Sequence, residues 1–414
     1  MKKERKWTSQ ELKEELERCQ KIINDYELEN NGVLKLGLFR SNTNPGISLM
    51  GVNKLIDNQI TIPDFVTRIS SFGKWNNDED IIINLGSGIT DYNEIFRNSL
   101  FKNLDVSNWD ISKIDNLKNL FASSKINNLK GIGNWDLSNH TELVQVFRSA
   151  KIENLDLSGW DVSNITNMLL LFSSAEITNL NVSNWNLSSL ETTANSKDSF
   201  GKSGLLFREA KITNLIGIDK WDISKLDCLV GWFGGAEISN LDLSNWDVSN
   251  ITNMCFLFEK FKGNLNIDNW NVSKVKNMLK VFNGTKSTST LNINEWDVSS
   301  VENMERLFSN TSISNIDISN WNVSNVTNME SIFDACKIKE IGDLSNWNVS
   351  KVKNFSFAFR KPIFKSVGMI GNWNVCNSDV TQMFYSAQLE PIGSVEGWKN
   401  NKHQEYMFQA SSLK

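Results

Sequence analysis

Most of the chain repeats one pattern of apolar and polar positions. Residues 152–175, which read IENLDLSGWDVSNITNMLLLFSSA, begin with the apolar spacing I-x-x-L-x-L-x-x-W-x-V. Alternation with a period of two predicts a short strand that ends near the Trp. The second half, I-x-x-M-x-x-L-F, changes to spacings of three and four, which predict one or two helical turns. We therefore expect each repeat to contain a strand, a corner and a short helical segment.

A tryptophan marks every repeat. It recurs at intervals of 24 to 26 residues, with one interval of 36 residues between Trp185 and Trp221. A period this constant over three quarters of the chain is typical of a solenoid, in which each repeat contacts only its neighbours. A Phe closes each repeat with the same regularity. The spacing thus predicts two buried aromatic columns, in which each ring stacks on its counterpart one repeat along.

The repeat frame is that of a leucine-rich repeat, with Trp in the place of the usual Asn or Cys. The predicted fold is a repeat solenoid, leucine-rich-repeat-like, with parallel short strands plus short helical segments. We expect tandem 25-residue repeats over residues 101–414, with an insertion at 191–204 that explains the long interval. Residues 31–100 are less regular, and we interpret them as an irregular cap with divergent repeats.

Residues 1–30 predict an amphipathic N-terminal helix. Thr8 and Glu11 have the spacing of a capping box, in which each side chain accepts a hydrogen bond from the backbone of the other. Leu12, Leu16 and Cys19 then recur at helical spacing on one face. We interpret this element as a helical cap that covers the first strand of the solenoid. A dimerisation or partner-binding helix is the alternative.

Composition and charge exclude several classes of function. The formal net charge is −5 and no polybasic tract is present, so neither nucleic acid nor a membrane is expected as a partner. The five cysteines are scattered and have no metal-ligand spacing, which indicates reduced core positions. His140 and His403 lie in different repeats, so no catalytic triad or histidine metal site is available. We expect a protein that is not an enzyme and that needs no cofactor or metal.

The N-terminal residues give one expectation about location. They start with basic residues but contain no apolar run, so the sequence shows no signal peptide. No later stretch is long and apolar enough for a membrane span. A cytoplasmic location is therefore expected from the sequence by itself.

The candidate binding surface is the strand face that points away from the core. On each strand it carries small polar residues six and four positions before the Trp. The candidate partner-binding residues are Asn103, Asp105, Asn154, Asp156, Asn181, Asn240, Asp242, Asn266, Asn315 and Asp317. This face lacks the Trp, Tyr and Arg that dominate binding hot spots. Either a partner is held by many weak polar contacts, or the face is a solvated ladder and binding lies elsewhere.

The repeat L-D-V-S-N-W-D-V-S-N-V-T-N-M-x-x-x-F resembles that of BspA-like leucine-rich-repeat bacterial surface proteins. The segment ITIPDFVTRI at residues 60–69 resembles the sister repeat of the same group, and the resemblance covers about residues 55–414. It implies a solenoid that is displayed at the cell surface or secreted, and often a function in adhesion or in binding a host protein.

These observations lead to a hypothesis and an alternative. The hypothesis is a non-enzymatic protein-interaction or adhesion module that presents an extended solenoid surface to a protein partner, including a host protein. The alternative is an intracellular structural scaffold that self-assembles through its helix and solenoid ends. The ligand and the oligomeric state stay open at this stage.

Overall fold

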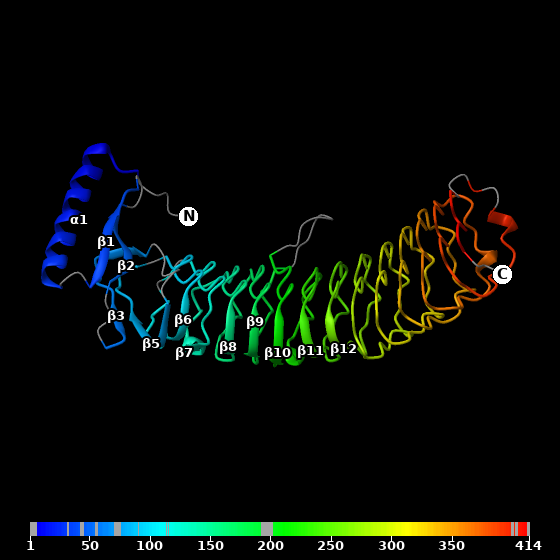
Figure 1. Cartoon of the computed structure of the whole chain (residues 1–414), viewed down its shortest axis with the longest axis horizontal. Helices are drawn as coiled ribbons and strands as arrows, with labels where there is room; N and C mark the ends of the chain where they lie inside the picture. Colours follow the sequence, from blue (N-terminus) through cyan, green and yellow to red (C-terminus); the bar gives the residue numbers. More distant parts are fainter. Residues whose placement is uncertain are drawn as a thin grey trace.

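The protein is one elongated, bowed solenoid with a helix at its N-terminal end (Figure 1). The computed structural model describes residues 6–30, 33–41, 45–53, 57–69, 76–89, 91–112, 114, 116–191, 202–398, 401 and 405–411, without the side chains of 76–80. None of the helices in this described part of the chain is long and apolar enough to cross a membrane. The predicted insertion at 191–204 falls largely on residues 192–201, which lie outside the described ranges.

The predicted N-terminal helix and its capping box are confirmed. Helix α1 (Ser9–Glu29) begins after Thr8, whose hydroxyl accepts the Glu11 N–H at 3.3 Å while a Glu11 carboxylate oxygen accepts the Thr8 N–H at 2.8 Å. Cys19 and Ile23 are its buried residues. The helix packs against β1 (Leu34–Phe39) and β2 (Gly46–Val52), which pair antiparallel. β2 also pairs parallel with β4 (Val66–Ile69), so α1 covers a small end sheet that is separate from the main one.

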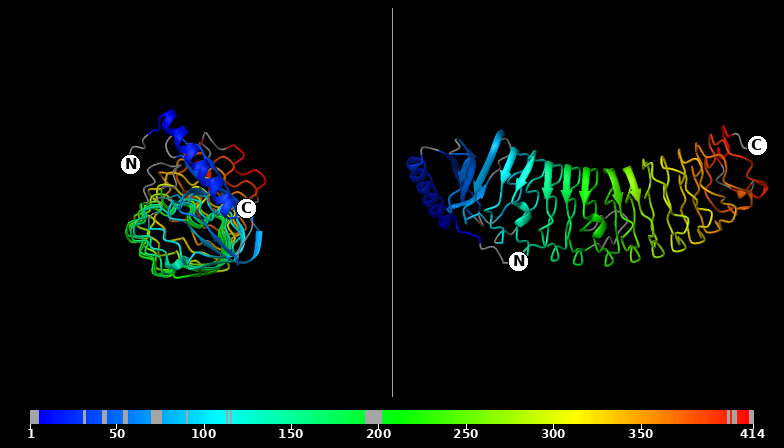
Figure 2. Two further views of the ribbon diagram at one scale, coloured as in Figure 1. Left: turned by 90° about the vertical axis from the view of Figure 1, so that its left-hand side faces the viewer. Right: turned by 90° about the horizontal axis from the view of Figure 1, so that it is seen from below.

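The main sheet follows the chain, one strand per coil. Its order among the described residues is β3 (Gln59–Thr61), β5 (Asn76–Asn84), β6 (Leu100–Asp105), β7 (Asn128–Lys130), β8 (Lys151–Asp156), β9 (Glu176–Asn181), β10 (Lys211–Ile216), β11 (Glu237–Asp242) and β12 (Lys262–Asn266). Every neighbouring pair is parallel. The strands line the inner side of the bow (Figure 2). Beyond β12 the coils continue through isolated parallel bridges such as Lys286 with Ser312. The predicted parallel-strand repeat solenoid is confirmed.

The two aromatic columns form the centre of the core. Successive Phe rings from Phe96 to Phe408 stack with centroids 5.3 to 5.9 Å apart. Trp160 and Trp185 lie 6.3 Å apart with their planes 1° from parallel. A buried aromatic side chain removes roughly 150–250 Å² from water. The two aromatic columns predicted from the spacing are confirmed, and burial of their rings contributes strongly to stability.

The short helical segments expected after each Trp are turns instead. The N–H of Leu171 donates to the Met168 carbonyl three residues back, but the next N–H, of Phe172, donates to Leu206 on the following coil at 3.0 Å. Leu170, which lies between Met168 and Leu171, has a φ of 58°, in the left-handed region. A helix would direct every N–H along its own axis, whereas a solenoid needs alternate N–H groups for the neighbouring coil. The short 3₁₀ segments precede a Trp or end on it: η1 (Ile132–Asn134), η2 (Ile218–Lys220), η3 (Ile370–Asn372) and η4 (Glu396–Trp398).

Candidate functional site

The candidate residues four positions before the Trp close a turn at the end of each strand. Asp156 Oδ1 accepts both the N–H and the hydroxyl of Ser158, at 3.0 and 2.7 Å. The same bond to the N–H two residues on is made, at 2.9 to 3.2 Å, by Asp105, Asn181, Asp242, Asn266 and Asp317. Asp and Asn can both accept this hydrogen bond because each has a side-chain oxygen acceptor at the same position. These side chains first of all satisfy the backbone of the corner.

The Asn residues six positions before the Trp form an amide ladder together with Asn128 and Asn214, which stand seven positions before theirs. The Asn128 amide donates to Asn103 Oδ1 at 2.8 Å, and Asn154 donates to Asn128 at 3.2 Å. The ladder continues from Asn179 to Asn154 and from Asn214 to Asn179, and it forms again from Asn264 to Asn240. Asn315 donates to Glu340 instead, at 3.0 Å. The structure thus brings the predicted residues onto one face. One column bonds to the backbone of its own corner and the other mainly to side chains of neighbouring coils, which favours the ladder interpretation.

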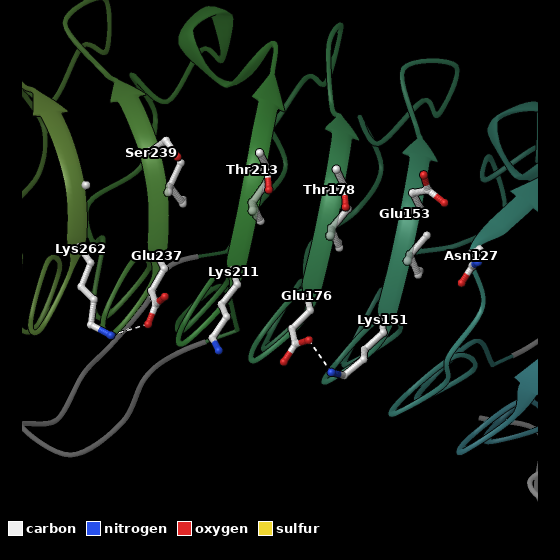
Figure 3. A pocket seen from close by; sticks show the side chains of 15 residues that line it. Asn127, Lys151, Glu153, Glu176, Thr178, Lys211, Thr213, Glu237, Ser239 and Lys262 are labelled. Atoms are coloured by element: carbon white, nitrogen blue, oxygen red, sulfur yellow. Dashed lines mark hydrogen bonds and ion pairs between the residues drawn. The ribbon is translucent and has the colours of Figure 1, made fainter.

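A shallow groove of about 640 Å³ crosses the starts of β8 to β12, beside the amide ladder (Figure 3). One row of its lining has a single charged residue on each strand: Lys151, Glu176, Lys211, Glu237 and Lys262. A second row consists of Asn127, Glu153, Thr178, Thr213 and Ser239. On β8 to β11 the two rows point outward because they flank the buried isoleucines Ile152, Ile177, Ile212 and Ile238. The groove is therefore continuous across five coils.

The charged row alternates in sign. Lys151 Nζ lies 2.5 Å from a Glu176 carboxylate oxygen, and Lys262 pairs with Glu237. The hydrogen bond from each lysine lowers the pKa of its glutamate. Lys211 lies in register between the two glutamates, and its charge adds to both pKa shifts. The result is a regular pattern of positive and negative charge with one sign per coil, at the roughly 4.8 Å spacing of paired strands.

The side chains in the second row of the groove become smaller toward β12. Glu153 gives way to Thr178 and Thr213, then to Ser239, and the row ends at Gly263. Gly263 has a φ of 140°, and a Cβ there would collide with the carbonyl oxygen of Ile238. Only glycine therefore fits this position. Neighbouring Thr and Ser hydroxyls leave the centre of the groove open and able both to donate and to accept hydrogen bonds.

The charged row escaped the sequence analysis for a geometric reason. Three of its members stand nine positions before their Trp, but Lys211 stands ten before and Lys262 eight before. The coil of β10 is one residue longer and has the left-handed glycine Gly217 directly after the strand. The pairing of β11 with β12 contains a register shift, because β12 is one residue shorter there. When the repeats are aligned on Trp alone, the members of the charged row therefore fall at three different alignment positions. Aligning the repeats on the buried isoleucines Ile152, Ile177, Ile212 and Ile238 would have revealed the alternation over the first four strands of the row.

The described residues that were considered for chemistry form no catalytic or metal-binding group. The His140 ring is buried, and its Nε2 lies 3.0 Å from the carbonyl oxygen of Ile111, while His403 is outside the described residues. Within the described ranges, no group of three or more His, Cys, Asp and Glu side chains is placed to hold a metal ion. The described cysteines are all free thiols, and of these Cys376 is exposed.

Fold and groove together define a repeat protein that presents a long polar surface of fixed geometry. A family model described as "Mycoplasma protein of unknown function, DUF285" matches residues 90–203, 203–290, 259–361 and 280–398. These matches cover most of the solenoid, and the chain belongs to this family. No curated protein and no solved structure matches the chain.

Proposed function

We propose that this protein is a non-enzymatic binding protein that holds an extended segment of a protein partner in the groove across β8 to β12. The single observation that carries the proposal is the alternating charged row along five successive strands, beside a row of small hydroxyl side chains. Side chains at a fixed coil spacing are suited to an elongated ligand that lies along the solenoid axis. Such concave sheet surfaces are the usual binding sites of solenoid proteins.

The charges in the groove determine what kind of segment fits. Each exposed ion pair contributes only about 0–1 kcal/mol, so affinity must come from several coils acting together. A partner with acidic and basic residues in alternation would place each charge against an opposite one. Its association would be steered by these charges and would become slower as salt rises. Nucleic acid and anionic membranes are poor partners for a row in which every lysine has a glutamate neighbour.

The finer family assignment belongs to this proposal. The Trp-marked repeat supports a leucine-rich-repeat variant of the BspA-like type, and that resemblance supports adhesion to a protein at the cell surface. Protease treatment of intact cells tests the location. Degradation of the protein under conditions that spare a cytosolic marker supports surface display. Full protection would favour the intracellular scaffold.

The binding proposal is tested by crosslinking in intact cells. A photoreactive amino acid at Thr213, in the middle of the groove, is expected to yield a discrete covalent adduct with one protein. The matched control carries the same group at Lys276, which is exposed but does not line the groove. Adducts of the same size and yield at both positions would contradict a groove-specific partner.

The purified partner then allows a charge test. Lys211→Glu places three negative charges on successive strands, and we expect it to weaken binding at least tenfold at low salt. Lys276→Glu makes the same change in net charge outside the groove and should leave binding unchanged. Equal effects of the two variants would mean that net charge, and not the groove, governs the interaction.

A further inference from the structure

The charged row of the groove continues along the solenoid beyond β12. On the strands, each member of the row donates its N–H to the carbonyl of the residue just before the row on the preceding coil, as Lys211 does to Ala175. The same bond joins four more coils, and its donors there are Lys286, Ser312, Lys337 and Ile363. The backbone thus shows that these four residues extend the charged row over coils that are not regular strands.

The second row of the groove continues over the same coils, two residues after the charged row. The Ser314 hydroxyl donates to the carbonyl oxygen of Thr288 on the preceding coil at 2.9 Å. The Glu390 N–H donates to the carbonyl oxygen of Lys365 in the same way, at 2.7 Å. The members of the second row in these four coils are Thr288, Ser314, Lys339 and Lys365. Both rows face outward, because a buried residue such as Ile338 lies between them on each coil.

The alternation of charge ends where the rows leave β12. Lys262 is the last lysine of the charged row that pairs with a glutamate. Beyond it the two rows carry four lysines and no acidic residue before Glu390. We name these four the lysine run: Lys286, Lys337, Lys339 and Lys365. All four are exposed, and none takes part in an ion pair within the part of the chain that the structure describes.

The coils do not require lysine at these positions. On β8 to β12 the same two rows carry glutamate beside lysine, or uncharged Thr and Ser, so the repeat accepts neutral and alternating side chains there. Lys339 and Lys365 stand on neighbouring coils of one row, at the roughly 4.8 Å spacing of paired strands, where like charges repel. Glu340 lies beside the run, but its carboxylate accepts the Asn315 amide at 3.0 Å. A run of unpaired positive charge favours a partner of negative charge.

An exposed apolar side chain lies within the lysine run. Ile363 is 46% exposed and occupies the charged row on the coil of Lys365. Every member of that row from Lys151 to Lys337 is charged or a serine. A single exposed isoleucine is ordinary by itself. Its place among the lysines means that a ligand bound there meets an apolar contact beside positive charge.

We propose that the lysine run binds an acidic segment that contains one apolar side chain, as the continuation of the partner segment held in the groove. This inference rests on the proposed function for its continuity with the groove, and it adds the chemistry of the next part of the partner. Three coil spacings separate Lys286 from Ile363, or about 14 Å, which about four or five residues of an extended chain cover. A stretch of that length places carboxylates near the lysines and its apolar side chain near Ile363.

Other anionic partners fit the lysine run less well. The rows follow the strands on the inner side of the bow, which a flat bilayer does not reach (Figure 2). Nucleic acid is disfavoured by the formal net charge of −5 and by the acidic residues Glu340 and Glu390 at the margins of the run. A short acidic peptide, by contrast, needs only the few lysines that are present.

Fluorescence anisotropy of the full chain with labelled synthetic peptides tests the proposal. The probe is a peptide in which Glu alternates with Ser around one Leu, and the comparison peptide has Lys in place of each Glu. At about 0.15 M salt, where charges are screened over about 8 Å, wild type is expected to bind the acidic probe and not the basic one. Lys337→Glu/Lys339→Glu/Lys365→Glu should weaken binding by about tenfold or more.

The matched control is Lys276→Glu/Lys351→Glu/Lys353→Glu. It makes the same change in net charge at exposed lysines beyond the corner that follows each Trp, and it should bind within about twofold of wild type. Ile363→Ser should weaken binding of the Leu probe and leave binding of a probe with Ser in place of Leu unchanged. Circular dichroism melting of each variant shows whether the fold is kept.

Three outcomes would overturn the inference. They are failure of wild type to bind the acidic probe, equal losses in the lysine-run variant and its control, and tighter binding of a single-stranded thymidine oligonucleotide that is lost in the same variant. The last result would assign the run to nucleic acid. The proposed function fails separately, because the crosslinking result at Thr213 does not depend on the lysine run.

Discussion

The indole N–H of Trp246 donates to the carbonyl oxygen of Ile218, which lies 2.8 Å away on the preceding coil. The same bond joins Trp160 to Ile132 at 2.7 Å. Each of these tryptophans satisfies its one polar atom inside the core while its ring packs on the rings of neighbouring coils. The Trp column therefore connects successive coils through a hydrogen bond and through apolar burial at the same point.

Trp246→Ala is expected to destabilise the protein by about 3–5 kcal/mol, because it leaves a cavity in the column and an unpaired carbonyl. The ring packs against Trp221, Trp232 and Phe233, whereas Trp398 packs against Phe384 near the C-terminal end. Trp398→Ala should therefore cost less. Equilibrium unfolding in urea measures both values. Equal losses for the two variants would contradict a column in which a ring with more aromatic neighbours contributes more to stability.

Gly263→Ala tests the narrowest backbone approach in the sheet. A φ of 140° is unfavourable for alanine, and the added methyl would collide with the Ile238 carbonyl. We expect a loss of about 1–3 kcal/mol in unfolding free energy. Gly397→Ala is the control, since a methyl there meets nothing within 4 Å. A thermal melt that is unchanged in Gly263→Ala would show that β12 has another backbone geometry in solution.

The sequence was sufficient to predict everything that depends on the repeat itself. A chain that buries one Trp and one Phe in every 25 residues can do so by stacking parallel coils. The aromatic columns could therefore be predicted from their spacing alone. The capping box at Thr8 was equally local. The turn segment was not predictable in this way, because spacings of three and four fit both a helix and a pair of turns. Whether the segment forms a helix or turns depends on hydrogen bonds to the next coil, which are not visible in the local sequence.

The candidate site shows the same limit at the level of single side chains. A Ser stands three positions after most of the Trp residues, where its hydroxyl could accept a backbone N–H as a helix N-cap does. In the structure the Ser163 N–H is the donor, and Asp161 accepts it at 3.0 Å. Whether the Ser or the Asp side chain accepts the backbone N–H depends on the geometry of the corner. The groove also could not be found from a single repeat, because it is a property of side chains that follow one another on successive coils.

Thiol reactivity gives an independent test of the core. Burial raises the pKa of Cys228 to about 11, and the pKa values of Cys255 and Cys336 to about 12. Cys19 lies on the buried face of α1, while Cys376 is exposed. A disulfide reagent near pH 8 should therefore modify one thiol per chain rapidly, and Cys376→Ser should abolish that phase. Guanidinium should expose all five cysteines. A second fast thiol in the native protein would mean that one of these positions is accessible.

The last prediction concerns acid stability and follows from the residue after each Trp. The pKa values of Asp161, Asp222, Asp247 and Asp297 are lowered by hydrogen bonds from the hydroxyl, and then the N–H, of the Ser two residues on. A carboxyl whose pKa is lower in the folded state stabilises the fold above its unfolded pKa of about 4, and this contribution is lost as the pH falls through the folded value. The wild-type melting temperature should therefore decline steeply below about pH 4.

Replacing these four residues together by Asn isolates the effect, because Asn186 already makes the same bond to the Ser188 N–H at 3.0 Å. The variant should melt close to wild type at pH 7 and lose less stability in acid, so its melting temperature plotted against pH should be flatter below about pH 4. Four Asp→Asn changes at carboxylates on other surface positions control for net charge. If the control flattens the profile equally, the acid sensitivity comes from overall charge repulsion, and the corner hydrogen bonds are not its source.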